Sequence, residues 1–65
     1  MWLEVNGERR EIAAASLDEA LEELGFAGRV VATAVNEDFV PMTARGTIRL
    51  SEGDRIEIVA PMQGG

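Results

Sequence analysis

A chain of 65 residues that contains no cysteine has to hold itself together without disulfides. A domain of this size buries only about 60% of the surface that its unfolded chain exposes, so nearly all of its apolar residues must share one core. Hydrophobic residues make up 46% of the sequence, which is enough for a compact fold and argues against disorder. We therefore expect residues 1–65 to form a single domain.

The composition also excludes several classes of function. Histidine, lysine and tyrosine are absent as well, so the usual general base, amine nucleophile and metal ligands are missing, and neither an enzyme nor a metal site is expected. Six basic residues against twelve acidic ones give a net charge of −6, which disfavours nucleic acid as a partner. No apolar run approaches the ~20 residues of a membrane span and no signal peptide is evident, which predicts a cytoplasmic protein without a membrane partner.

The first half of the sequence predicts a hairpin followed by a helix. Alternation over residues 1–5 is typical of a half-buried strand, and Asn6-Gly7 is a strong hairpin signal before a second strand at residues 8–13. A Ser-x-x-Glu capping box at residues 16–19 begins the helix, and Gly25 is placed for a left-handed cap at its end. Four apolar residues recur at helical spacing, namely Leu17, Ala20, Leu21 and Leu24.

The middle of the chain predicts two more strands joined by a turn. Residues 30–35 are rich in β-branched residues, and residues 36–38 form the turn. A short fourth strand begins at residues 39–40, and Pro41 confines it to a sheet edge because proline lacks a backbone donor. Residues 42–46 are expected to be irregular.

The end of the chain predicts a last strand and a flexible tail. A tight turn at residues 51–54 leads into residues 55–59, in which Ile56 and Ile58 face the core. Residues 61–65 are expected to form the flexible C-terminal tail. Together the elements predict an α+β fold, in which a mixed sheet of four to five strands packs on one helix and the first and last strands pair side by side.

Several segments are typical of one known family: residues 3–7, Val35-Asn36, Val40-Pro41, residues 52–59 and the terminal Gly64-Gly65. On these segments, which span nearly the whole chain, the sequence resembles the ThiS-like sulfur carrier proteins of thiamine biosynthesis, bacterial relatives of ubiquitin. The resemblance implies the ubiquitin-like β-grasp fold. Residues 42–44 depart from the family pattern, since they read Met-Thr-Ala where members often carry arginine and then an aromatic residue.

The resemblance implies that the working group is the C-terminal carboxylate of Gly65. An E1-like adenylyltransferase would use ATP to join this carboxylate to AMP, and sulfur from a donor such as a cysteine desulfurase would displace AMP. The resulting thiocarboxylate would supply sulfur to a thiazole synthase. In this scheme the chain is a covalent co-substrate that binds no cofactor, and Gly64 and Gly65 lack the Cβ that would hinder a narrow channel.

Partner binding is expected on an outward apolar patch beside the tail. Strand alternation sends Val59 outward, whereas Phe39 belongs either to this patch or to the core. Met62 and Gln63 are assigned to partner binding with them. Trp2 shares the outward phase of the first strand, where it either extends the patch or shields the sheet.

Two alternatives to a thiamine-pathway carrier remain at this point. The first is a related carrier, such as the small subunit of molybdopterin synthase, which would use the same tail chemistry with another acceptor. The second is a β-grasp binding module whose Gly-Gly end has no chemical role. A gain of sulfur by the tail would separate the carriers from the passive module.

Overall fold

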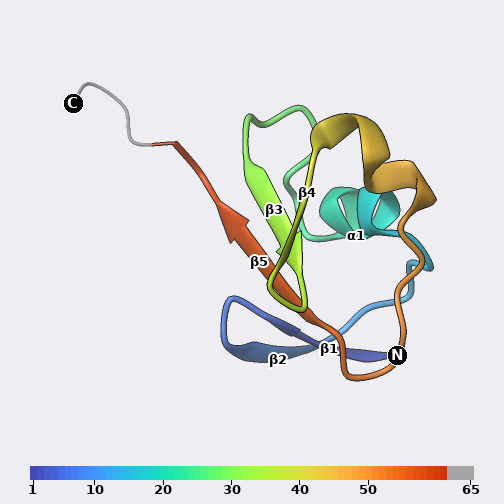
Figure 1. Ribbon diagram of the computed structural model, residues 1–65. Coiled ribbons are helices and arrows are strands. Elements are labelled where there is room, and N and C mark those ends of the chain that lie inside the picture. The colour runs from blue at the N-terminus through green and yellow to red at the C-terminus, as the bar shows by residue number, and fades with distance from the viewer. Residues whose placement is uncertain (62–65) are drawn as a thin grey trace.

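The computed structural model describes residues 1–61, and Met62, Gln63, Gly64 and Gly65 lie outside this range. In chain order its elements are β1 (Trp2–Val5), β2 (Glu8–Glu11), helix α1 (Leu17–Glu23), β3 (Ala32–Val35), β4 (Asp38–Val40), the 3-10 helix η1 (Met42–Thr47) and β5 (Arg55–Val59) (Figure 1). The flexible tail expected over residues 61–65 therefore falls outside the described residues from position 62 onward.

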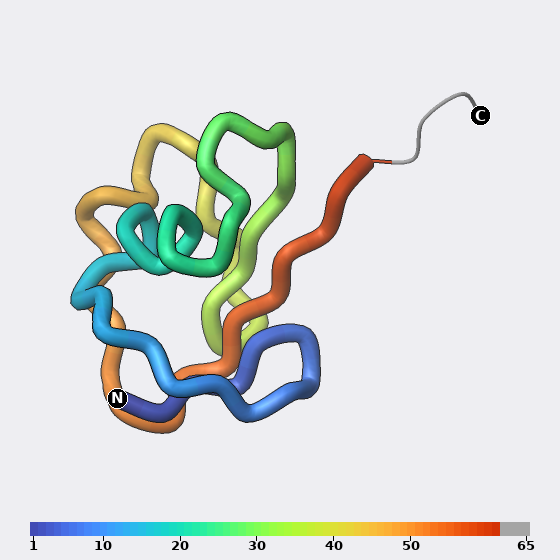
Figure 2. The backbone as a smooth tube through the Cα atoms, turned by 180° about the vertical axis from the view of Figure 1, so that it is seen from behind, coloured from blue at the N-terminus to red at the C-terminus, as the bar shows by residue number. Residues whose placement is uncertain are grey.

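Within residues 1–61, five strands form one mixed sheet in the order β2-β1-β5-β3-β4. β1 and β5 are parallel, and the other neighbouring strands are antiparallel. The expected pairing of the first and last strands is thus confirmed, and β4 lies at an edge as Pro41 indicates. β5 runs through the middle of the sheet, and its carboxyl end leads away from the body of the molecule in both views (Figures 1 and 2).

The core lies on one face of this sheet, which α1 covers. Residues of β1 and β5 alternate between this core and the exposed face, and in β5 Ile56 and Ile58 are buried and their neighbours are exposed. The expected orientation of these two isoleucines is confirmed. The buried apolar residues of the core are Leu3, Val5, Ile12, Leu17, Ala20, Leu21, Val40, Leu50, Ile56 and Ile58.

Both caps of α1 lie where the sequence predicts them, although the Glu19 carboxylate accepts from the Ser16 hydroxyl instead of the Ser16 backbone N–H of a capping box. The Ser16 hydroxyl accepts a hydrogen bond from the Glu19 N–H at 3.2 Å and donates one to the Glu19 carboxylate at 3.1 Å. At the other end Gly25 has a φ of 91°, and the Phe26 N–H donates to the Leu21 carbonyl at 2.8 Å. This is the Schellman arrangement, which ends a helix at a left-handed glycine.

Two hairpin turns have the same construction. Asn6 and Gly7 join β1 to β2 with φ of 51° and 84°, and Asn36 and Glu37 join β3 to β4 with φ of 50° and 74°. Two positive φ angles are typical of the two-residue turns that match the twist of a hairpin, and asparagine tolerates them better than most residues. The second turn is shorter than expected, because Asp38 already belongs to β4.

β2 and β3 are shorter than the sequence predicts. β2 ends at Glu11, two residues early, because the chain turns toward α1 and the Glu23 carboxylate accepts hydrogen bonds from the Ala13 and Ala14 N–H groups at 3.0 Å. The exposed Glu23 side chain therefore has a structural role, because it holds the chain between β2 and α1. β3 begins at Ala32 instead of residue 30, which leaves Val30 exposed.

The expectation of irregular structure over residues 42–46 is wrong, because η1 occupies this segment and carries a buried arginine. The Arg45 side chain is 7% exposed, and its Nε donates to the Thr33 hydroxyl at 3.0 Å while its Nη2 donates to the Val31 carbonyl at 2.6 Å. The Thr33 hydroxyl in turn donates to the Val40 carbonyl at 2.9 Å. The guanidinium thereby ties η1 to β3 and, through Thr33, to β4.

This network predicts that Arg45→Met destabilises the fold. The variant keeps the apolar stem but removes the donor to the buried Thr33 hydroxyl and to the partly buried Val31 carbonyl, which costs about 1–3 kcal/mol. Urea unfolding measures the loss. The matched control is Arg49→Met, which removes an exposed guanidinium and should change stability by no more than about 0.5 kcal/mol. Equal effects of the two substitutions would show that the buried hydrogen bonds contribute nothing.

Candidate functional site

The residues that precede the tail follow β5, a strand that is paired along both edges. The expected reactive residues Gly64 and Gly65 lie outside the described residues, as do the expected partner-binding residues Met62 and Gln63. In β5, Ile56 is opposite Val5 of β1 on one side and opposite Val35 of β3 on the other. The tail therefore follows a strand that is held along both edges.

Two asparagine side chains add hydrogen bonds at the two ends of β5. Asn6 Oδ1 accepts from the Ile58 N–H at 2.8 Å, and its Nδ2 donates to the Ile58 carbonyl at 3.1 Å. Asn36 Oδ1 accepts from the Arg55 N–H at 3.0 Å, and its Nδ2 donates to Asp54 Oδ1 at 3.0 Å. In sequence, both asparagines indicate only a turn. The one signal for their second role is a carboxamide, which can both donate and accept, at the first position of each turn.

An apolar patch lies on the exposed face of the sheet next to the end of β5. Three of its side chains are largely solvent-exposed, with fractions of 79% for Val30, 70% for Phe39 and 62% for Val59. Two shallow depressions meet here and share Ala32 and Val59. We define the apolar patch as Val30, Ala32, Phe39, Val59 and Pro61.

Phe39 belongs to this patch and not to the core. It lies opposite Ala34 on the face that α1 leaves uncovered, whereas its neighbour Val40 points to the core and is 5% exposed. The expected outward orientation of Val59 is also observed. Val30 was not predicted as a patch residue, because residues 30–35 were all assigned to a strand. In the structure β3 begins at Ala32, and Val30 lies in the loop before it.

Trp2 lies at a different place on the sheet and does not extend the apolar patch. The Arg9 guanidinium stacks over its ring at 4.6 Å from the ring centre, in the range of a cation–π contact. Trp2 borders a depression with Arg9, Glu52 and Gly53, none of which belongs to the patch. Of the two interpretations of Trp2, shielding of the sheet is therefore the one that the structure supports.

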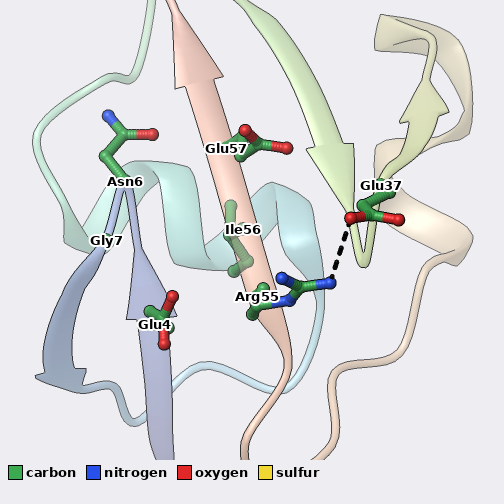
Figure 3. Close-up of a pocket in the computed structure, with 7 residues that line it drawn as sticks. All are labelled: Glu4, Asn6, Gly7, Glu37, Arg55, Ile56 and Glu57. Carbon is green, nitrogen blue, oxygen red and sulfur yellow. Dashed lines mark ion pairs between the residues drawn. The ribbon is translucent and has the colours of Figure 1, made fainter.

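A polar pocket adjoins the patch along β5 and is rich in carboxylates. Figure 3 shows Arg55 between Glu4 and Glu37, with Glu57 farther along the strand. Arg55 forms an ion pair with Glu37 at 3.4 Å, and both side chains are more than half exposed, so solvent screens the pair. Glu57 lines both this pocket and the depression that holds Phe39, so negative charge borders the apolar patch.

Residues 1–61 bring together no group of three or more side chains of the types that hold a metal ion. Neither helix formed by these residues has the length and apolar character needed to cross a membrane.

Comparison with known proteins identifies the chain from end to end. Residues 3–65 match the ThiS family, and the match includes the Gly-Gly end. The chain belongs to the ThiS family. It is 40% identical over 65 residues to the sulfur carrier protein ThiS of Thermus thermophilus, an alignment that covers the whole chain and 98% of that relative.

Two further proteins are similar to this ThiS family member. A crystal structure of the thiamine biosynthesis protein ThiS from Geobacter metallireducens superposes with a TM-score of 0.81 at 30% identity, and the match covers both chains fully. This likeness confirms the β-grasp fold. The chain is also 41% identical over 66 residues to a thiazole synthase of Paramagnetospirillum magneticum, but it spans only 20% of that protein's length.

The position of Phe39 predicts a contrast between two neighbouring residues. Phe39→Ala should change the free energy of unfolding by no more than about 0.5 kcal/mol, because the ring contributes little to the core. Val40→Ala should cost about 1–3 kcal/mol, because it opens a cavity in the core. Both values come from urea unfolding of the purified variants. A larger loss for Phe39→Ala than for Val40→Ala would contradict the placement of the ring on the surface.

Proposed function

We propose that this chain is the sulfur carrier of thiamine biosynthesis and that Gly65 is the residue that carries the sulfur. The observation that carries the proposal is membership of the ThiS family over residues 3–65, which includes both terminal glycines. The 40% identity to the sulfur carrier protein of Thermus thermophilus, over 98% of that relative, supports it. Family membership also favours thiamine biosynthesis over molybdopterin synthesis, and it favours a chemical role for the tail over a passive binding module.

The proposed chemistry takes place at the carboxylate and needs two displacement steps. A carboxylate oxygen of Gly65 attacks the α-phosphorus of ATP and pyrophosphate leaves, which gives an acyl adenylate. A sulfur nucleophile then attacks the acyl carbon, the bond to AMP breaks, and a carbon–sulfur bond replaces it. When the nucleophile is sulfide, the product is the thiocarboxylate itself. When it is a persulfide, the product is an acyl disulfide, which a thiol reductant must cleave to give the thiocarboxylate.

The catalytic groups for these steps belong to partners. An E1-like adenylyltransferase would bind ATP, and a donor such as a cysteine desulfurase would supply sulfur, so the chain itself needs neither a cofactor nor a metal. The absence of histidine, cysteine, lysine and tyrosine from the sequence fits a covalent co-substrate. Because ATP and reduced sulfur are both consumed, we place the reaction in the cytoplasm.

A thiazole synthase is the proposed acceptor of the sulfur. A protein with that name contains a segment 41% identical to this chain, which supports a functional association between carrier and synthase. The thiocarboxylate sulfur is a soft nucleophile that can attack a ketone or imine carbon during ring assembly. The synthase, in this proposal, receives the tail in a channel that admits Gly64 and Gly65 because neither has a side chain.

The apolar patch is the proposed docking surface for these partners. Phe39 and Val59 supply exposed apolar area next to the root of the tail, and Met62 and Gln63 would continue the contact toward the glycines. Contiguous exposed apolar residues are typical of interaction sites. The neighbouring carboxylates Glu4, Glu37 and Glu57 favour a partner surface with basic residues, because complementary charge steers association.

Intact-mass measurement tests the carrier function. The chain is incubated with ATP, sulfide and the E1-like adenylyltransferase of the same organism, and it should gain the mass of one sulfur minus one oxygen. A variant that ends at Gln63 and a reaction without ATP serve as controls, and neither should gain mass. An unmodified full chain in the presence of active adenylyltransferase would refute the proposal.

The docking role of the patch predicts a selective kinetic effect. Phe39→Ser should raise the KM of the adenylyltransferase for the carrier about tenfold or more, as loss of an interface aromatic commonly does. Trp2→Ser removes the other exposed aromatic ring, which lies outside the patch, and should leave KM within about threefold. The rate of pyrophosphate release at varied carrier concentration gives KM for each variant. Equal changes in KM for the two variants would remove the case for a patch centred on Phe39.

A further inference from the structure

The pairing of β5 with β1 ends before β5 does. The β1 side supplies backbone hydrogen bonds from Glu4 N–H to the Asp54 carbonyl at 2.9 Å and from Asn6 N–H to the Ile56 carbonyl at 2.9 Å. The next residue of β5 that faces β1 is Ile58, but at this point the β1 chain has already entered its turn. Without a further partner, the Ile58 backbone groups on this edge would be open to water.

The Asn6 side chain supplies that partner. Its carboxamide accepts from the Ile58 N–H at 2.8 Å and donates to the Ile58 carbonyl at 3.1 Å, so one side chain replaces one residue of a neighbouring strand. Asn6 has a φ of 51° and is the first residue of the turn between β1 and β2, so its side chain takes over where the pairing of β1 ends. On the other edge, β3 holds the same stretch, since Thr33 lies opposite Ile58 and Ala32 opposite Val59.

We propose that Asn6 is a positioning residue that fixes the direction in which the C-terminal tail leaves the sheet. This inference rests on the proposed function, because a fixed direction matters only if the tail must enter a partner's active site. The last bonds that Asn6 makes are at Ile58, which is one residue before Val59 and three before Pro61. Its loss would release one edge of the strand that carries the tail, while the core isoleucines would remain buried.

The expected consequence is weaker productive binding with unchanged chemistry. A partner that receives a loosened strand end must order it during binding, and fixing the backbone of one residue corresponds to roughly a tenfold change in affinity. Once bound, the carboxylate reaches the same position, so the maximal rate stays the same. A purely structural role would lower stability but would leave the KM of the folded protein unchanged.

Asn36 provides a matched control for this proposal. It occupies the same position in its own two-residue turn, has nearly the same φ of 50°, and bonds the same strand through its carboxamide. It does so at Arg55, however, which is the end of β5 farthest from the tail. Glycine tolerates positive φ, so Asn6→Gly and Asn36→Gly each remove a carboxamide and preserve the turn.

The experiment compares the two glycine variants with the natural chain in adenylation by the E1-like enzyme, measured as pyrophosphate release. Asn6→Gly should raise KM about tenfold with kcat unchanged, whereas Asn36→Gly should leave KM within about twofold. Asn6→Asp keeps the acceptor for the Ile58 N–H and loses the donor, so its KM should fall between those of the natural chain and Asn6→Gly. An unchanged KM for Asn6→Gly, or equal increases for both glycine variants, would overturn the proposal.

Amide hydrogen exchange followed by NMR gives a reading that does not depend on any partner. In Asn6→Gly the Ile58 amide should exchange at least about tenfold faster, and in Asn36→Gly it should not. If the natural chain fails to be adenylated, the carrier function is refuted, and the exchange comparison still decides whether Asn6 holds the strand end. Unchanged exchange at Ile58 in Asn6→Gly would refute the holding role itself.

Discussion

The parallel pairing of β1 with β5 is the constraint on which the rest of the structure depends. It joins the two ends of the chain in the middle of one sheet, and it sets the register in which Ile56 and Ile58 face the core. A shift of one residue would turn these isoleucines to solvent and bring Glu57 and Val59 inward, which the core could not accommodate. This one register determines which residues of β5 are buried, which residues form the patch, and where the tail begins.

Local signals allowed most of the fold to be predicted. The Asn6-Gly7 turn, the Ser16 cap and the Gly25 cap each act within a few residues, so their physics can be recognised in sequence. Arg45 could not be anticipated in the same way, because its acceptors are Thr33 on β3 and Val31 just before it, both more than ten residues away. The same limit applied to Phe39. The sequence shows that Phe39 and Val40 face opposite sides of the sheet, but which side is the core depends on where α1 packs.

The candidate site shows the same division between local and long-range information. The exposure of Val59 follows from simple alternation in β5, so it was predictable. The role of Asn6 was not, since the sequence indicates a turn but gives no distance to a strand some fifty residues later. Gly64 and Gly65 were assigned through resemblance alone and lie outside the described residues, so their role stays a prediction.

The proposed docking and the proposed chemistry can be coupled through the exposed face of the sheet. Among the described residues, α1 and the core cover one face of the sheet, and the opposite face is exposed. Val59 belongs to the apolar patch on that face, and its neighbour Ile58 is held by Asn6 on one edge and lies opposite Thr33 on the other. A partner that binds the patch therefore binds a strand whose position is already fixed. The free energy of docking can then be used to place the tail, because little is lost in ordering its root.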